Sequence, residues 1–240
     1  MITMTLNPKQ KRQIELQVKA HAVPWKYMIN VPSAVARPVL RNLVMYPGVL
    51  QPLSSGHFGR FLHDHPEFFE GKSVLDMGCG SGALGIIMAK CGARKVVLAD
   101  IDENCCANTR ENVRRFRVGA RCEVIQSDLF DKIPGKFDLI IFAHPYFGAP
   151  PVLPAIPVTR GMLDDGQLIA RFLDTAKKHL AGSILMPYLH LAGKTNDPAV
   201  QGPKHGYRVE TLEKKNLGVG YQRGAYSVYA LHDESRKDLR

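Results

Sequence analysis

The chain has 240 residues, of which 45% are hydrophobic, and this is enough for one large domain with an added segment. Its formal net charge of +10 would attract phosphate or an acidic partner, although it identifies neither. No run of about 18 apolar residues predicts a membrane span, the N-terminus lacks a signal-peptide pattern, and the five cysteines include no C-x-x-C pair. We therefore expect a cytoplasmic protein with reduced thiols and without a membrane span, a zinc site or a disulfide framework.

Residues 8–22 are predicted to form a charged helix at the start of the chain. Asn7 suits the N-cap position and Pro8 the first helical position. The next stretch, up to residue 54, is rich in proline around a short predicted helix at residues 34–45. We expect residues 1–54 to be a helical extension that covers the main domain.

The main domain, residues 55–240, alternates short β-rich runs with helical stretches from Lys72 onward. The expected strands are residues 73–77, 95–100, 122–126, 137–142 and 182–189, and the expected helices are residues 82–91, 103–117 and 162–181. This α/β pattern predicts a doubly wound, mostly parallel seven-stranded sheet. Two further alternating runs, residues 207–215 and 222–232, predict an antiparallel strand pair at the end of the sheet.

The most basic stretch of the sequence lies in the helix expected at residues 103–117 and just after it. Its cations follow helical spacing, and they are Arg110, Arg114, Arg115, Arg117 and Arg121. A solvated helix face explains this pattern, and a nucleic-acid patch is the alternative. Aromatic residues are not interleaved with the arginines, which favours the solvated face.

A glycine-rich loop follows the first strand of the main domain, in VLDMGCGSGALGI. Glycines at positions 78, 80 and 82 permit positive φ and a close approach of backbone N–H groups to a ligand. The loop also fits the dinucleotide fingerprint, with Ala83 at the last position. However, Asp76 would oppose a pyrophosphate, whereas it suits a ligand that carries an ammonium and a sulfonium. Asp100 ends the second strand, where its carboxylate can accept hydrogen bonds from both hydroxyls of a ribose.

These motifs resemble those of class I S-adenosylmethionine-dependent methyltransferases, in the small-domain group that includes the release-factor glutamine methyltransferases. The resemblance covers roughly residues 50–232, and the matching segments are residues 76–82, 99–102, 127–130 and 137–146. It implies a Rossmann-like fold and S-adenosyl-L-methionine as the cofactor. The candidate cofactor-binding residues are Asp76, Gly78, Cys79, Gly80, Gly82, Asp100, Ile101, Asp128, Leu129 and Ala143.

The resemblance assigns parts of the cofactor to these residues. Asp76 and the glycine loop would meet the methionyl part, Asp100 the ribose, and Asp128 with Leu129 the adenine. Ile101 would supply a second apolar face to the purine. An aspartate that follows a strand can instead be the cap of the next helix, and this alternative stays open for Asp100, Asp102 and Asp128.

The fourth strand ends in Ala143, His144, Pro145 and Tyr146, where the resembled family has Asn-Pro-Pro-Tyr or Asp-Pro-Pro-Tyr. Alanine lacks the side-chain acceptor that grips a planar amide or amine in that family, so we do not expect that style of amide or adenine methylation. The candidate catalytic residues are His144 and Tyr146. His144 is either a general base or a packing residue, and Tyr146 is expected to line the site.

Residues 50–62 are expected to run over the cofactor. The candidates to close the pocket are Ser54, Ser55, His57 and Phe58. Tyr188, at the end of the fifth strand, is placed either toward the ligand or in the core.

We therefore expect a methyltransferase that acts on a small molecule or a protein side chain by in-line transfer. A cyclase that releases methylthioadenosine and a catalytically silent cofactor-binding subunit are the alternatives. A NAD-linked dehydrogenase is disfavoured because no hydride-transfer motif is found. The sequence names neither the acceptor nor an oligomeric state, and nucleic acid is not the favoured partner.

Overall fold

A seven-stranded sheet forms the centre of the molecule, in a computed structural model that describes residues 6–31, 39–51, 55–150, 157–217 and 224–236. The strands are β3 (Ser73–Met77), β4 (Lys95–Asp100), β5 (Cys122–Gln126), β6 (Phe137–Phe142), β9 (Leu180–Leu189), β10 (Tyr207–Leu217) and β11 (Gly224–Asp233). Their order is β10-β11-β9-β6-β3-β4-β5, and β11 runs antiparallel to both of its neighbours. The predicted mostly parallel sheet and its terminal antiparallel pair are confirmed.

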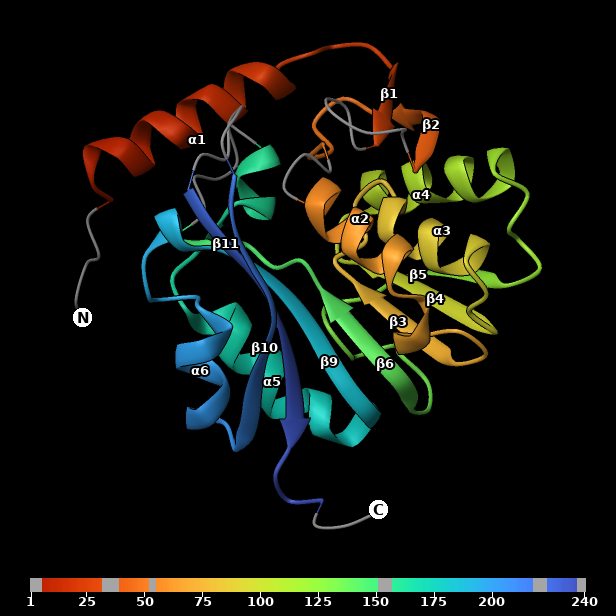
Figure 1. The fold of residues 1–240 in the computed structure, drawn as a ribbon. Helices are drawn as coiled ribbons and strands as arrows, with labels where there is room; N and C mark the ends of the chain where they lie inside the picture. Colours follow the sequence, from red (N-terminus) through yellow and green to blue (C-terminus); the bar gives the residue numbers. More distant parts are fainter. Residues whose placement is uncertain (1–5, 32–38, 52–54, 151–156, 218–223, 237–240) are drawn as a thin grey trace.

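Helices cover both faces of this sheet (Figure 1). One face carries α2 (Ser55–Asp64), α3 (Ala83–Lys90) and α4 (Glu103–Arg115), and the other carries α5 (Gln167–His179) and α6 (Pro198–Lys204). Successive strand residues alternate between the two cores: Val74 packs into the first and Leu75 into the second. This period of two is the expected consequence of side chains pointing to opposite faces of a pleated strand. Of the five sequence-predicted core strands, β3, β4, β6 and β9 therefore have two buried faces, whereas β5 lies at the edge of the sheet and its residues are half-buried or exposed.

The N-terminal segment forms helix α1 (Pro8–His21) and a hairpin of β1 (Tyr27–Val31) and β2 (Leu40–Met45). The start of α1 has the predicted cap, since Asn7 and Gln10 form a reciprocal capping box around Pro8. Figure 1 shows α1 above the end of the sheet at which β9 ends. There the Gln10 amide donates to the carbonyls of Leu191 and Ala192, at 3.1 and 3.0 Å.

The last residue of α1, His21, connects the helix to the chain that follows the hairpin. Its imidazole is buried, with Nδ1 at 2.5 Å from the carbonyl oxygen of Gln17 and Nε2 at 2.7 Å from the backbone N of Gln51. A carbonyl only accepts and an amide N–H only donates, so the ring is neutral, with its proton on Nδ1. Burial lowers the pKa of His21 and so favours this neutral form.

The hairpin is fixed to α4 by buried asparagine side chains. The amide of Asn112 accepts from Val44 N at 2.9 Å and donates to the carbonyls of Val44 and Ser81 at 2.8 and 2.9 Å. One turn earlier, Asn108 accepts from Tyr46 N and donates to the carbonyl of Val44. The edge of β2 that faces α4 is therefore satisfied by side-chain amides instead of a third strand.

Three sequence expectations differ from the structure. The helix expected at residues 34–45 is wrong where the chain is described, because residues 40–45 form β2 and Asn42 has a φ of 59°. The helix expected at residues 162–181 begins only at Gln167, because Gly166 has a φ of 97° and the preceding residues pair as β8 (Leu163–Asp164) with β7 (Phe147–Gly148). The third difference is α6, whose first residue is Pro198, because the sequence analysis expected no helix at residues 198–204. In the described part of the chain, no helix is long and apolar enough to cross a membrane.

Replacing Asn112 by alanine is expected to detach the hairpin from α4. The change leaves Val44 and Ser81 with unpaired buried backbone groups, which should lower the free energy of unfolding by about 2–4 kcal/mol. Urea denaturation measures this loss, and hydrogen exchange should show faster exchange at the Val44 amide. Asn216→Ala, in an exposed position on β10, serves as the matched control and should cost less than about 0.5 kcal/mol.

Candidate active site at the carboxyl ends of the strands

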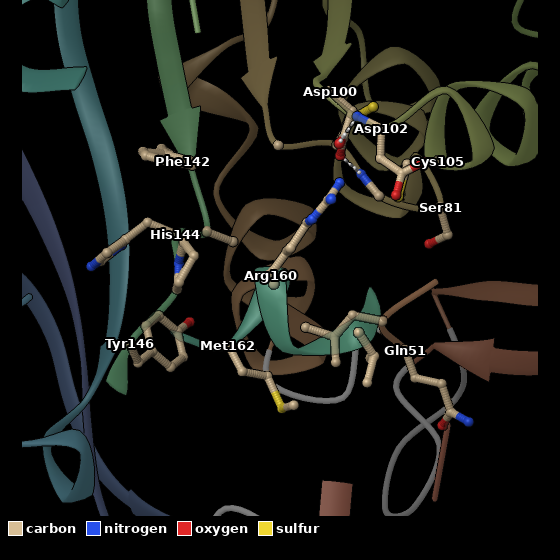
Figure 2. A pocket seen from close by; sticks show the side chains of 18 of the residues that line it. Gln51, Ser81, Asp100, Asp102, Cys105, Phe142, His144, Tyr146, Arg160 and Met162 are labelled. Atoms are coloured by element: carbon tan, nitrogen blue, oxygen red, sulfur yellow. Dashed lines mark hydrogen bonds between the residues drawn. The ribbon is translucent and has the colours of Figure 1, made fainter. Parts of the chain in front are cut away.

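A cavity of about 180 Å³ lies where β3, β4 and β6 end (Figure 2). Its walls come from three parts of the chain. The sheet supplies the glycine loop after β3 and the residues that follow β4 and β6. The N-terminal segment before α2, described at residues 6–31 and 39–51 and called the N-terminal cover below, supplies Gln17, Gly48, Leu50 and Gln51. The 3₁₀ helix η2 (Pro157–Gly161) supplies Val158 and Arg160. Open α/β sheets bind ligands at this edge, so the position agrees with the sequence prediction.

The glycine loop needs glycine for conformation and for space. Gly78, Gly80 and Gly82 have φ angles of 66°, 56° and 78°, in the left-handed region that other residues avoid. A Cβ on Gly82 would lie 2.9 Å from the Thr109 side chain, and one on Gly78 would lie 3.3 Å from the Phe142 ring. A Cβ on Gly80 would meet nothing within 4 Å. The loop is therefore packed against α4 and β6 on two sides and open on the cavity side.

Asp100 stands at the end of β4, and backbone groups fix both of its oxygens. Oδ2 accepts from Gly80 N at 2.9 Å and Oδ1 from Asp102 N at 3.0 Å. Burial raises the pKa of this carboxyl, and its hydrogen bonds to backbone N–H groups oppose the rise. Asp102 accepts from Asn104 N and is the N-cap of α4, so the cap alternative is correct for Asp102, which also lines the cavity. The neighbouring Ile101 is 55% exposed at the cavity wall.

Asp76, which the resemblance assigned to the methionyl part of the cofactor, does not lie at the cavity wall. It is 1% exposed beneath the glycine loop and is not among the cavity-lining residues. Its Oδ2 accepts from Gly85 N at 2.8 Å. Burial raises the pKa of Asp76 to about 7, and the nearby Asp100 adds to the rise. Asp76 is the penultimate residue of β3, a strand buried in the centre of the sheet, and this position explains why its carboxyl group does not reach the cavity.

Three other predicted cofactor residues also lie outside the described cavity wall. Gly82 is part of the glycine loop but faces α4. Asp128 forms an ion pair with Arg171 at 2.9 Å, and Leu129 is 8% exposed with a φ of 45°. Their predicted contacts with an adenine stay predictions. Gly78, Cys79, Gly80, Asp100, Ile101 and Ala143 do line the cavity, as do His144 and Tyr146.

His144 is held by bonds and packing instead of being presented to solvent. It is 2% exposed, and its Nε2 donates to the carbonyl of Asn196 at 2.6 Å. The ring stacks on Tyr188 with centroids 5.9 Å apart and an interplanar angle of 11°. Burial lowers the pKa of His144 to about 4, against the opposing effect of the Asn196 and Phe142 carbonyls. A base this weak is poorly matched to proton removal near neutral pH, so the structure favours the packing alternative.

Asn196 grips the turn after β6 from two sides, which explains why a buried strand ends in an imidazole. Its backbone carbonyl accepts from His144, and its side-chain amide donates to the carbonyls of Pro145 and Asp164 at 3.3 and 2.8 Å. The sequence analysis missed Asn196 because 52 residues separate it from His144 and no local pattern links them.

Tyr146 fulfils its predicted position, since it lines the cavity and is 7% exposed. Its ring packs edge-on against His144 and Tyr188, at centroid distances of 5.4 and 5.5 Å. Tyr188 belongs to the core: it is fully buried and donates to the carbonyl of Gly193 at 3.0 Å. Ala143 also lines the cavity but offers no side-chain acceptor.

The expected closure of the pocket by residues 50–62 is only partly correct. Leu50 and Gln51 line the cavity, but Phe58 is fully buried in the core and His57 packs near the Tyr226 ring, with centroids 6.0 Å apart. Both lie on α2, so the helix turns them away from the cavity. Ser54 lies outside the described residues, and Ser55 begins α2.

Arg160 and the thiols complete the electrostatic description of the cavity. Among the described lining residues, Arg160 is the one permanent cation, and Figure 2 shows it extending toward Asp100. No sequence pattern identifies Arg160 as a cavity residue. Burial raises the pKa of Cys79 well above its usual value and also raises that of Cys105, so neither thiol is an activated nucleophile. No cluster suited to a metal ion occurs in the ranges that the structure describes.

Comparison with known proteins gives relatives with the same architecture. A "Ribosomal protein L11 methyltransferase" from Thermosipho africanus is 42% identical over 93 residues, which are 35% of this chain and 35% of the relative. The solved L11 methylase from Lactobacillus delbrueckii subsp. bulgaricus has a TM-score of 0.56 at 17% identity, covering 85% of this chain and 97% of its own. A T. thermophilus 16S rRNA methyltransferase in complex with AdoMet and guanosine has a TM-score of 0.58 at 19% identity, covering 87% and 50%.

The structural and the sequence matches cover different shares of the chain and support different conclusions. The solved structures establish the class I methyltransferase fold, whereas the aligned part spans about a third of the length of the T. africanus relative. The pattern of the family described as "Methyltransferase small domain" matches residues 59–185, a little over half of the chain. That stretch contains the glycine loop, Asp100 and the turn after β6. The chain therefore belongs to the methyltransferase small domain family.

Proposed function

We propose that this protein transfers a methyl group from S-adenosylmethionine to an acceptor on a protein or a small molecule. The observation that carries the proposal is Asp100, which is fixed beside an open glycine loop at the cavity wall. Each of its oxygens accepts one backbone N–H and keeps a second lone pair, so the carboxylate can still accept from ribose hydroxyls. The exposed Ile101 beside it offers an apolar surface to a purine.

The two carboxylates at the glycine loop fit a cationic nucleoside, although Arg160 is a permanent cation among the described lining residues of the cavity. Asp76 lies beneath the loop and Asp100 beside it, and burial disfavours the ionised form of both. A nearby ammonium or sulfonium would favour their ionisation, whereas a pyrophosphate would oppose it. S-adenosylmethionine supplies a methyl group that its sulfonium already activates. The residues of the chain have the tasks of orienting the two reactants and excluding water.

The acceptor side of the cavity is aromatic and apolar. Tyr146, Phe147, Met162 and Leu50 line it, and Ala143 replaces the amide-gripping residue. An acceptor group with a planar or apolar body fits these walls, and its position would be set by packing instead of by a side-chain hydrogen bond from residue 143. A protein acceptor is supported by the relatives named for ribosomal protein L11 methylation.

The products of S-adenosylmethionine distinguish this proposal from its alternatives. The purified protein is incubated with methyl-labelled cofactor, alone and with a cell extract separated into protein and small-molecule fractions. Methyl transfer predicts adenosylhomocysteine and label in one fraction, only when that fraction is present. Methylthioadenosine formed without any acceptor would establish a cyclase instead, and binding without turnover in any mixture would establish a silent subunit.

Asp100→Ala is expected to weaken binding of S-adenosylmethionine by about 1–3 kcal/mol, which is roughly 5- to 150-fold. The reason is the loss of the acceptor for the ribose together with the hydrogen bond that fixes Gly80. Isothermal titration calorimetry measures the change. Asp131→Ala, at an exposed position, is the control and should leave affinity unchanged. Equal affinities of the two variants would remove Asp100 from the site.

Asp76→Asn is expected to stabilise the empty protein while weakening cofactor binding. The folded pKa of Asp76 is about 7 against an ordinary 3.8, so its contribution to stability is full below pH 4 and is lost as pH rises through 7. The amide keeps an acceptor for Gly85 N but removes the charge. At pH 8 the variant should gain roughly 1–3 kcal/mol, with little gain at pH 4.

Thermal unfolding at the two pH values measures the stability change, and calorimetry measures cofactor affinity. Asp131→Asn is the control for both. A variant that is equally or less stable at pH 8 would show that Asp76 carries no buried-charge penalty, and unchanged affinity would show that its charge does not reach the cofactor.

A further inference from the structure

We propose that an exposed face formed by the N-terminal hairpin and helix α4 binds single-stranded nucleic acid. This surface is called the basic face below, and it consists of Trp25, Lys26, Met28, Arg41, Arg110, Arg114, Arg115 and Arg117. All eight residues are exposed. Binding to this face does not depend on S-adenosylmethionine, so it goes beyond the methyl transfer proposed above.

Direct contacts join the two parts of the basic face. Lys26 forms an ion pair with Glu111 of α4 at 3.0 Å and lies over the Tyr46 ring, 3.9 Å from its centroid. Arg115 donates from Nε to the carbonyl of Asn42 at 3.0 Å, and its terminal nitrogen lies 3.4 Å from the sulfur of Met28. The hairpin residues are about 70–90 positions from α4 in the sequence, so the fold creates this surface.

The basic face carries cations that its own carboxylates do not neutralise. Glu111 pairs with Lys26, and Glu103 pairs with Arg110 at 2.6 Å. The other guanidinium groups have no carboxylate within 4.0 Å in the described part of the chain, and they belong to Arg41, Arg114, Arg115 and Arg117. A group of unpaired cations attracts a polyanion and gains by releasing its counterions.

The side chains favour nucleic acid over an acidic protein. Five of the six cations are arginines, whose planar guanidinium matches phosphate oxygens and stacks on bases. Trp25 is 65% exposed and Met28 57% exposed, and they are two of the four large hydrophobic side chains that are exposed among the described residues. Trp25 directly precedes Lys26, which contacts α4, and its exposed indole offers a stacking surface for an unpaired base. Stacking adds to phosphate binding on such surfaces. The sequence lacked this argument because Trp25 is far from the arginines along the chain.

The basic face leads to the cavity through both of its elements. Asp102 and Cys105, at the first turn of α4, line the cavity, and so do Gly48, Leu50 and Gln51, which follow β2. The 13 residues of α4 span about 20 Å, so a strand bound along the helix reaches the cavity rim. A nucleic acid held there would lie next to the acceptor side of the site.

Trp25 is the single tryptophan of the chain, so its fluorescence reports directly on stacking. Titration with an oligouridylate of about 12 nucleotides should quench this emission. The anisotropy of the same oligonucleotide, carrying a fluorescein, should give a dissociation constant that rises steeply with salt. Both titrations use the full chain without S-adenosylmethionine.

Charge reversal locates the binding surface. Arg41→Glu combined with Arg114→Glu should weaken oligonucleotide binding by tenfold or more at about 0.1 M salt. Lys132→Glu combined with Lys136→Glu makes the same change in net charge at exposed positions between β5 and β6, and should change binding by less than about threefold. Trp25→Ala should weaken the oligonucleotide by roughly fivefold or more, but not inorganic polyphosphate, which has no bases.

Several outcomes would overturn the proposal. They are an absence of quenching, equal weakening by the two charge-reversed variants, an equal loss of polyphosphate binding in Trp25→Ala, and tighter binding of polyglutamate than of the oligonucleotide. Calorimetry with S-adenosylmethionine on the same variants separates the two proposals. A wild-type protein that binds the cofactor but not the oligonucleotide rejects only the basic face, whereas a wild-type protein that binds no cofactor rejects the proposed function.

Discussion

The glycine turn after β3 is held between two carboxylates, and the rest of the site depends on this arrangement. From below, Asp76 accepts the N–H of Gly85 and orients the first turn of α3. From the side, Asp100 accepts the N–H of Gly80 and links the turn to the end of β4. Both groups are buried enough that ionisation costs free energy in the empty protein. A cation bound near these two carboxylates would lower the free-energy cost of their ionisation.

The same loop also explains why the N-terminal cover is integral to the molecule. Asn112 donates to the carbonyl of Ser81 in the loop and bonds Val44 of the hairpin with the rest of its amide. A single buried side chain therefore connects the cover, α4 and the glycine turn. On the other side of the cavity, Gln10 fixes α1 to the end of β9. The N-terminal cover is thus fixed at two places, one beside β9 and one at α4, on either side of the cavity.

Local patterns were sufficient to predict the strands of the sheet, the helices α3, α4 and most of α5, and the position of the glycine loop. The alternation of β-rich and helical runs fixed the strands, and the glycine spacing with Asp100 fixed the loop, because these features depend on residues close in sequence. The N-cap of α1 at Asn7 was predicted for the same reason. What failed depended on distant partners. Residues 40–45 were predicted as helix, but they form a strand because they pair with β1 on one edge and with the side-chain amides of α4 on the other.

The end of β6 shows this limit most clearly. An imidazole beside a predicted active site suggests a base, and only the carbonyl of Asn196, 52 residues away, shows that the ring is anchored. Asp76 was misplaced for a related reason, since its depth in the sheet depends on how α3 packs over it. Arg160 follows a segment with no periodic pattern, and the sequence offered no reason to place it in the cavity.

His21 gives the cover a sensitivity to acid. Its neutral ring accepts a hydrogen bond from the backbone N–H of Gln51 and donates one to the backbone carbonyl of Gln17. These two bonds join α1 to Gln51, which lines the cavity. A second proton would turn Nε2 into a donor facing another donor, and the junction would become repulsive. Acidification should therefore break the contact between α1 and Gln51 while the central sheet stays folded. The N-terminal wall of the cavity would then open more readily, and ligands would enter and leave faster.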